Sequence, residues 1–272
     1  MKILDKTKWI IVFSVCAVIA VAARFADTLL ASKLYMPDSL FGTFFVFISP
    51  SLSLILASFS SAVMMACRNT RTTRTKNQLL NVFYGVLSVV FSFAAACYPF
   101  IGTGKMNFTV IAGVTALVAG ASMVMSFLMF KETYQKIVMT EMAKRIITAA
   151  LIISVICALA LLIPQRGSYE AIRINMEKFG KADGPYESTV PFVSFMGASA
   201  PVLLYFTCFK DAIPKLKFSG NLIFILSCIW SLCVIFGSVS SGHMYLSEAS
   251  YGMIIGYITV FAVSKYYEKR EN

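Results

Sequence analysis

The sequence of 272 residues has few of the side chains that catalyse reactions in soluble enzymes. It contains one histidine, and only 13 acidic residues against 24 basic ones. It has no Gly-rich phosphate loop, no His-Glu-x-x-His helix and no Gly-x-Ser-x-Gly elbow, which argues against common nucleotide-binding, zinc-protease and serine-hydrolase classes. Its apolar segments also lack the chain of Asp and Glu residues that a proton-coupled pump needs, which weakens the case for an ion-coupled transporter.

Cysteine is present in an odd number, seven, and every cysteine falls within or at the end of an apolar segment. None has a metal-ligand spacing with the histidine. The sequence therefore predicts no disulfide framework, no metal site and no cofactor, and we expect buried, unreactive thiols. They are Cys16, Cys67, Cys97, Cys157, Cys208, Cys228 and Cys233.

What the sequence has in abundance is apolar residues, which make up 58% of the chain and give a mean hydropathy of +0.77. They form runs close to the length of about 20 residues that crosses a bilayer core. The runs are Trp9–Leu30, Phe44–Cys67, Leu79–Ile101, Phe108–Phe130, Ile146–Ile163, Pro191–Phe209, Leu222–Ser238 and Ala249–Ser264. Because lipid offers the backbone no hydrogen-bond partners, we predict an all-α polytopic membrane bundle of about eight transmembrane helices.

The net charge of +11 is distributed in a way that predicts membrane orientation and not nucleic-acid binding. With a cytoplasmic N-terminus, alternate crossing leaves most basic residues inside, including the Arg68–Lys76 cluster. The basic residues left outside are Arg24, Lys33, Lys105, Arg166, Arg173, Lys178 and Lys181. We therefore predict cytoplasmic N- and C-termini and, because the loops are short, a bacterial plasma (inner) membrane.

Proline and small residues inside the runs predict how the helices pack. Pro50 and Pro99 each free a backbone carbonyl that a nearby Ser side chain can serve. The Ala112-Ala116-Gly120 spacing and the Gly252-Gly256 spacing mark faces for close helix approach, which we expect to be used within the chain. The second run also carries hydroxyls that either line a transport pathway or pack helices: Ser49, Ser51, Ser53, Ser58, Ser60 and Ser61.

Three polar elements are predicted to meet at the outer membrane face. Arg166 follows the fifth run, Ser194–Ala200 opens the sixth, and Ser240–Glu248, which contains the only histidine, joins the last two. A phosphoester enzyme at a membrane surface needs fixed cations, hydrogen-bond donors and a nucleophilic or basic His. The alternative is an ordinary interfacial histidine with no chemical role.

Over the last four predicted spans this layout resembles the type 2 phosphatidic acid phosphatase superfamily. Arg166 stands where the first, basic motif of that family lies. The stretch Ser194–Ala200 resembles Ser-Phe-Pro-Ser-Gly-His-Ala, and Tyr245–Glu248, with Gly252 and Gly256 beyond it, resembles the third motif. The Ser-Gly-His-x-Tyr-Leu string is also similar to a motif of the fat-storage-inducing transmembrane proteins, which are relatives of the same phosphatases.

The chain departs from the family pattern at each motif. Leu159 stands where the first motif has Lys, and Gly167 replaces its Pro. Ser199 stands at the place of the second-motif His, and Ser247 lies four residues after His243, where the family has Asp. The usual mechanism with two histidines cannot operate with one, so the resemblance implies the fold more than the activity.

The resemblance implies a protein that binds a lipid phosphate or polyprenyl (pyro)phosphate, and that either hydrolyses it or is a catalytically inactive relative. It divides the chain into accessory helices, residues 1–145, and a phosphatase-like half, residues 146–272. The implied catalytic residues are His243 and Glu248, and the implied substrate-binding residues are Arg166, Arg173, Ser199, Ser241 and Tyr245. The other hypothesis is a non-enzymatic transporter, permease subunit or scaffold, in which His243 is incidental. In both cases the expected partners are membrane lipids.

Overall fold

The computed structural model describes residues 6–34, 36, 39–67, 73–101, 107–129, 133–162, 220–241 and 246–271. All regular structure in these residues is α-helical, which confirms the all-α part of the prediction for this part of the chain. The helices are α1 (Lys6–Leu34), α2 (Leu40–Cys67), α3 (Arg74–Ile101), α4 (Phe108–Met129), α5 (Thr133–Leu162), α8 (Gly220–Ser240) and α9 (Leu246–Glu271). The predicted span Pro191–Phe209 lies outside the described residues.

Several helices extend beyond the apolar runs that predicted them. Helix α5 begins at Thr133, well before the run that opens at Ile146, and α9 continues past Ser264 to Glu271. These extensions carry charged residues, of which Lys265 and Lys269 are exposed and Lys136 and Lys144 are partly buried. The ends of these two helices therefore do not coincide with the ends of the apolar runs.

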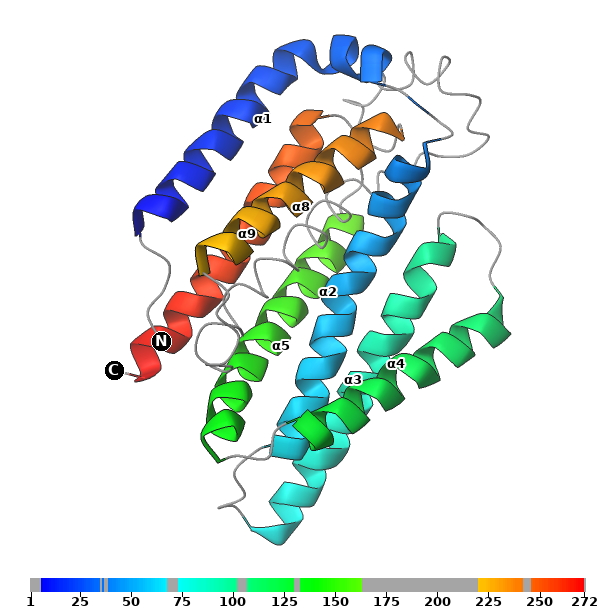
Figure 1. The fold of residues 1–272 in the computed structure, drawn as a ribbon, viewed down its shortest axis with the longest axis vertical. Helices are drawn as coiled ribbons and strands as arrows, with labels where there is room; N and C mark the ends of the chain where they lie inside the picture. Colours follow the sequence, from blue (N-terminus) through cyan, green and yellow to red (C-terminus); the bar gives the residue numbers. More distant parts are fainter. Residues whose placement is uncertain are drawn as a thin grey trace.

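Helix α2 lies in the middle of the bundle, where it contacts α3, α4, α5 and α8, and α9 packs against α1, α5 and α8 (Figure 1). From α1 to α5 each helix runs opposite to the one before it; α8 runs in the same direction as α5, and α9 runs back (Figure 1). The starts of α3 and α5 and the ends of α2, α4 and α9 consequently lie toward one end of the molecule (Figure 1). At that end the Cys67 thiol of α2 lies 3.9 Å from the Ser126 carbonyl oxygen of α4.

Positive charge is concentrated at this same end among the described side chains. Its lysines and arginines are Arg74, Lys76, Lys136, Lys144, Arg145, Lys265 and Lys269. Lys33, near the end of α1, lies toward the opposite end (Figure 1). A one-sided distribution of this kind is the charge pattern of proteins inserted in a membrane.

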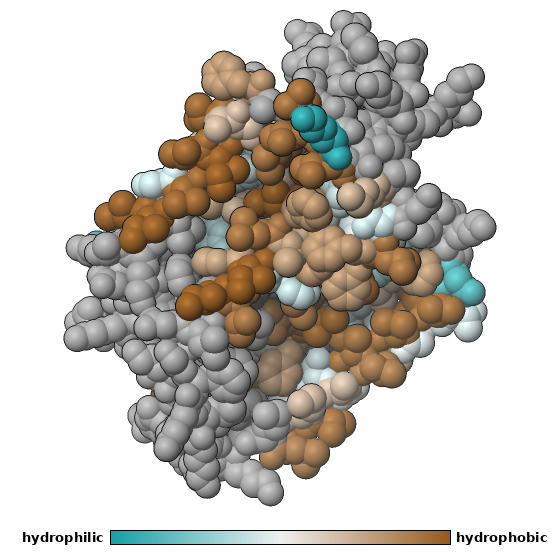
Figure 2. All heavy atoms as spheres, turned by 45° about the horizontal axis from the view of Figure 1, so that its top comes forward, coloured by the Kyte–Doolittle hydropathy of each residue, from teal (hydrophilic) through white to brown (hydrophobic). Residues whose placement is uncertain are grey.

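The helices direct apolar side chains outward and hydroxyls inward. On α3, Val82, Val86 and Phe93 are at least half exposed, whereas Ser88 and Ser92 are fully buried. Apolar side chains cover much of the face seen in Figure 2. Three helical stretches are long and apolar enough to cross a membrane by length and composition: Ile48–Cys67, Arg74–Phe100 and Phe108–Leu128. Shorter apolar stretches occur at Phe13–Ala23 and Cys228–Ser240.

The two small-residue faces predicted for close packing behave differently. Gly252 and Gly256 of α9 are buried, which confirms the prediction for that helix. Ala112 and Ala116 of α4 are exposed, and a Cβ added at Gly120 would meet no heavy atom within 4 Å. The prediction that this α4 face packs within the chain is therefore wrong for the described residues, because α4 contacts α2 and α3 through another face.

The carbonyl that Pro99 leaves without its helical donor belongs to Ala95, four residues earlier. The Ser51 hydroxyl of α2 donates a hydrogen bond to that carbonyl at 3.0 Å, and the contact is buried. This confirms the prediction that a serine side chain serves a carbonyl freed by a proline in the bundle. Helix α3 continues through the proline to Ile101.

Candidate functional site

Most of the predicted site residues lie outside the described part of the chain: Arg166, Arg173, Ser199, His243 and Tyr245. Ser241 is described at the end of α8, and Glu248 occupies the first turn of α9. The four residues between Ser241 and Leu246 include His243. The described site is therefore the end of the bundle from which the histidine segment departs, and the convergence of Arg166, Ser199 and His243 stays a prediction.

The last turn of α8 is tied down by several hydrogen bonds. The Ser241 backbone N–H donates to the Gly237 carbonyl at 3.0 Å, and the Ser240 hydroxyl donates to the same carbonyl at 3.1 Å. The Ser241 hydroxyl donates to the Ser238 carbonyl at 3.2 Å. These contacts satisfy carbonyls that a helix end otherwise leaves open. A ligand that accepts a hydrogen bond from the Ser241 hydroxyl must therefore compete with the Ser238 carbonyl.

Met36 and Ser39, which lie between α1 and α2, connect this helix end to the first turn of α2. The Met36 backbone N–H donates to the Ser240 carbonyl at 2.7 Å. Ser39 is the N-cap of α2, where its hydroxyl accepts a hydrogen bond from the Gly42 N–H at 3.2 Å. The predicted histidine segment thus leaves α8 beside the first turn of α2, a neighbour that sequence motifs in the last four spans did not reveal.

Two glycines bring α2 and α8 into close contact at this point. A Cβ added at Gly237 would lie 2.9 Å from the Phe45 Cβ, and one added at Gly42 would lie 3.1 Å from the Gly237 carbonyl oxygen. A side chain at Gly237 would force its surroundings to shift, and one at Gly42 would require its neighbours to give by a few tenths of an ångström. Glycine is the residue that permits two backbones to approach in this way.

Aromatic rings line the same α2–α8 contact. Phe45 lies 5.1 Å from Trp230 and 4.6 Å from Phe41, measured between ring centroids. Phe41 in turn lies 5.9 Å from Phe236, in an edge-to-face arrangement. Aromatic pairs at these distances stabilise a contact beyond their buried area. The α2–α8 contact beside the candidate site is therefore packed and apolar, and Phe41 and Phe236 remain partly exposed.

Several serine hydroxyls of α2 form hydrogen bonds inside the bundle. The Ser58 hydroxyl lies 3.0 Å from that of Ser88 and 2.7 Å from that of Ser92. The hydroxyls of Ser60 and Ser61 donate to carbonyls one turn earlier in α2. These contacts favour helix packing over a transport pathway as the reason for the serines. The buried Ser49 hydroxyl has no hydrogen-bond partner in the part of the chain that the structure describes.

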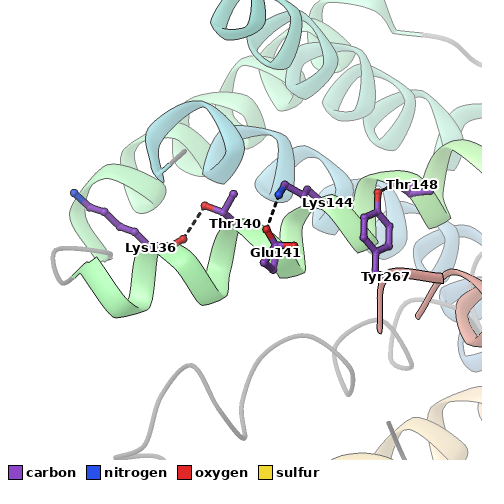
Figure 3. A network of polar contacts seen from close by, with 6 residues as sticks. All are labelled: Lys136, Thr140, Glu141, Lys144, Thr148 and Tyr267. Carbon is purple, nitrogen blue, oxygen red and sulfur yellow. Dashed lines mark hydrogen bonds and ion pairs between the residues drawn. The ribbon is translucent and has the colours of Figure 1, made fainter. Parts of the chain in front are cut away.

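A second polar cluster, which sequence reasoning missed, joins α5 to α9. Arg145 is only 3% exposed, and its guanidinium carbon lies 6.0 Å from the centre of the Tyr267 ring. The Tyr267 hydroxyl hydrogen-bonds that of Thr148 at 2.9 Å, and Lys144 pairs with Glu141 one turn away (Figure 3). Lys144 and Arg145 belong to the basic residues that the sequence places on the cytoplasmic side, and the structure adds that the Arg145 side chain is buried. The sequence feature that could have indicated its burial is that Arg145 directly precedes the apolar run at Ile146.

Tyr267→Phe is expected to lower the stability of the protein by about 0.5–1.5 kcal/mol, the usual contribution of one hydrogen bond. The change removes the hydroxyl that bonds Thr148 and keeps the ring beside Arg145. The measurement is the thermal unfolding midpoint in detergent. Tyr266→Phe is the matched control, because the adjacent Tyr266 is 53% exposed. An equal loss in both variants would show that the α5–α9 contact adds nothing.

No group of three or more His, Cys, Asp or Glu side chains that could hold a metal ion occurs within the described residues. Cys16 and Cys67 are buried free thiols, and Cys97, Cys228 and Cys233 are half-buried free thiols. Cys157 is in α5 and Cys208 lies outside the described residues.

Comparison with known proteins adds no relative: no family model, no curated protein and no solved structure matches this chain.

Proposed function

We propose that this chain is a multi-pass protein of a bacterial inner membrane that binds a lipid phosphate or polyprenyl (pyro)phosphate at its outer face. The helix content, the three apolar helices and the charge at one end of the bundle support membrane insertion with that end, and both termini, in the cytoplasm. The end of α8, which leads to His243, then faces outward (Figure 1).

The observation that carries the proposal is the Ser240–Glu248 segment, with the only histidine of the chain, at the junction of α8 and α9. In this proposal Arg166 and Arg173 hold the phosphate oxygens, since guanidinium groups bind them through paired hydrogen bonds. Glu248 orients His243. The hydroxyls of Ser199, Ser241 and Tyr245 contact the phosphate, and their assignment follows from the motif resemblance.

Hydrolysis would begin with attack of a His243 ring nitrogen on the terminal phosphorus, which forms an N–P bond and breaks the P–O bond to the leaving group, an ester bond in a lipid phosphate and an anhydride bond in a pyrophosphate. The leaving oxygen takes a proton from water, because the chain has no second histidine to supply it. Water then cleaves the N–P bond, releases inorganic phosphate and regenerates the imidazole. Because no second histidine protonates the leaving group, the alternative form of this function is binding of the lipid without hydrolysis.

Purified protein in detergent is expected to release phosphate from phosphatidic acid or undecaprenyl pyrophosphate. His243→Ala should lower the rate at least about 100-fold, the lower range for removing an acid–base or nucleophilic group. Arg166→Ala should weaken lipid binding, and Lys33→Ala is its control for general attraction to anionic lipid. A His243→Ala protein with the activity of the parent removes the site assignment. If the parent binds these lipids without releasing phosphate, the inactive form of the function holds.

A further inference from the structure

The Ser49 side chain of α2 differs from the other buried serines of this helix in its hydrogen bonding. It is 1% exposed, and its hydroxyl has no hydrogen-bond partner among the residues that the structure describes. The hydroxyls of Ser51, Ser58 and Ser61, by contrast, each have a partner inside the bundle. A buried hydroxyl that stays unpaired costs free energy. Ser49 therefore needs a partner that the described residues do not supply.

Ser49 directly precedes Pro50, a proline inside α2 that is also buried. Proline has no N–H, so the carbonyl of Val46, four residues before Pro50, loses its helical donor. The proline ring also crowds that carbonyl and widens the turn. Because the Cα–Cβ bond of a helical residue points toward the preceding turn, the Ser49 side chain lies over the turn that contains Val46. A hydroxyl without a described partner and a carbonyl without its helical donor therefore lie within one turn of α2.

At Pro99 of α3 the same backbone problem is met by a direct contact, because the Ser51 hydroxyl donates to the freed Ala95 carbonyl at 3.0 Å. Ser49 makes no such bond. The Ser49 hydroxyl and the Val46 carbonyl therefore need a third group that donates and accepts hydrogen bonds and is small enough for a helix turn. Water has these properties, whereas lipid chains offer neither a donor nor an acceptor.

We infer that the Pro50 turn of α2 binds one ordered water molecule, which donates a hydrogen bond to the Val46 carbonyl and shares a second one with the Ser49 hydroxyl. A buried water needs about 2–4 polar partners, and these two groups supply the first of them. Ser49 lies near the start of the stretch Ile48–Cys67, which is long and apolar enough to cross a membrane. The inference is independent of the proposed function, because it involves none of that function's site residues.

The bound water gives α2 a bend point. Proline and a water inserted into the hydrogen-bond ladder are both known causes of helix bending. The part of α2 before Pro50 carries Gly42 and Phe45, which contact α8, and the part after it carries Ser51 and Ser58, which contact α3. The two parts are therefore oriented by different partners, and the water completes the hydrogen bonding where they join.

The test is Ser49→Ala in the full chain, followed by thermal unfolding in detergent. If water pairs the hydroxyl, the variant loses a hydrogen bond and the midpoint falls by about 2–4 °C. If the hydroxyl is unpaired, its removal relieves a desolvation cost and the midpoint stays or rises. Ser60→Ala is the matched control, because Ser60 is also 1% exposed and donates to the Leu56 carbonyl, which keeps its ordinary helical donor. Its midpoint should stay close to that of the parent.

Pro50→Ala returns a helical donor to the Val46 carbonyl, so in that background Ser49→Ala should lower the midpoint much less. An equal fall in both backgrounds, or an unchanged or higher midpoint for Ser49→Ala alone, would overturn the inference. Where a variant does not fold, a density map of the parent protein that resolves ordered water decides. It should show a water about 2.5–3.0 Å from both the Ser49 Oγ and the Val46 carbonyl oxygen, and a map without that water would equally overturn the inference.

Discussion

Gly237→Leu is expected to lower the thermal unfolding midpoint of the purified protein sharply, or to prevent recovery of folded protein. Even the first carbon of the new side chain would lie 2.9 Å from the Phe45 Cβ, which is closer than non-bonded carbons approach. The remaining atoms would have to enter the space of α2, so the two helices must separate. Overpacking of this kind costs about 1–3 kcal/mol, and often more where backbone must move. Unfolding followed by intrinsic fluorescence measures it directly, since Trp230 packs on Phe45.

The matched control is Gly113→Leu on α4, a position open to its surroundings. Leucine has a higher helix propensity than glycine by about 0.5–1 kcal/mol, so this substitution should leave the midpoint unchanged or raise it. Gly237→Ala should fall between the two, because its single methyl group still meets the Phe45 Cβ. A loss for Gly113→Leu as large as that for Gly237→Leu would contradict a specific α2–α8 contact.

The helices themselves could be predicted because each follows from local properties of the chain. A run of about 20 apolar residues in lipid must close its own hydrogen bonds, and a helix does so without reference to any other segment. The freed carbonyl of Pro99 was predictable for the same reason, because proline chemistry acts within one turn. The identity of its donor, Ser51, depends on the register of α2 against α3 and could be anticipated only as a serine nearby.

Small-residue spacing predicted helix packing for Gly252 and Gly256 of α9 but not for α4. The Ala112-Ala116-Gly120 pattern gives α4 a narrow face, yet that face is exposed within the described residues. Gly42 of α2 and Gly237 of α8 instead bring two helices close together, at positions that the spacing analysis did not mark. Spacing tells which face of a helix is narrow, whereas the partner depends on packing over the whole bundle.

In the candidate site, too, the local features could be predicted and the contacts between distant segments could not. The sequence itself shows that Ser241 and Glu248 stand on either side of His243, between the last two predicted spans. It does not reveal that Met36 and Gly42 lie against Ser240 and Ser241, because these two residues lie some 200 positions earlier and Met36 makes its contact through a backbone N–H. Backbone donors carry no signature in the sequence.

Ser51→Ala is expected to destabilise the protein by about 1–2 kcal/mol, because it leaves the buried Ala95 carbonyl without a donor. The cause can be isolated by restoring the helical donor. Pro99→Ala returns a backbone N–H to position 99, and that N–H can bond the Ala95 carbonyl within α3. In the Pro99→Ala background, Ser51→Ala should therefore cost much less. The double-mutant coupling, measured by unfolding in detergent, should exceed about 0.5 kcal/mol.

Ser61→Ala is the matched control for this cycle. Ser61 is as deeply buried as Ser51, but its hydroxyl donates to the Ala57 carbonyl of its own helix, which has no proline four residues later. Its loss leaves that carbonyl with its ordinary helical donor, so the cost should be small and independent of residue 99. If Ser51→Ala costs the same with proline or alanine at position 99, the serine does not serve the proline. The contact between α2 and α3 would then depend on packing and the Ser58, Ser88 and Ser92 hydroxyls alone.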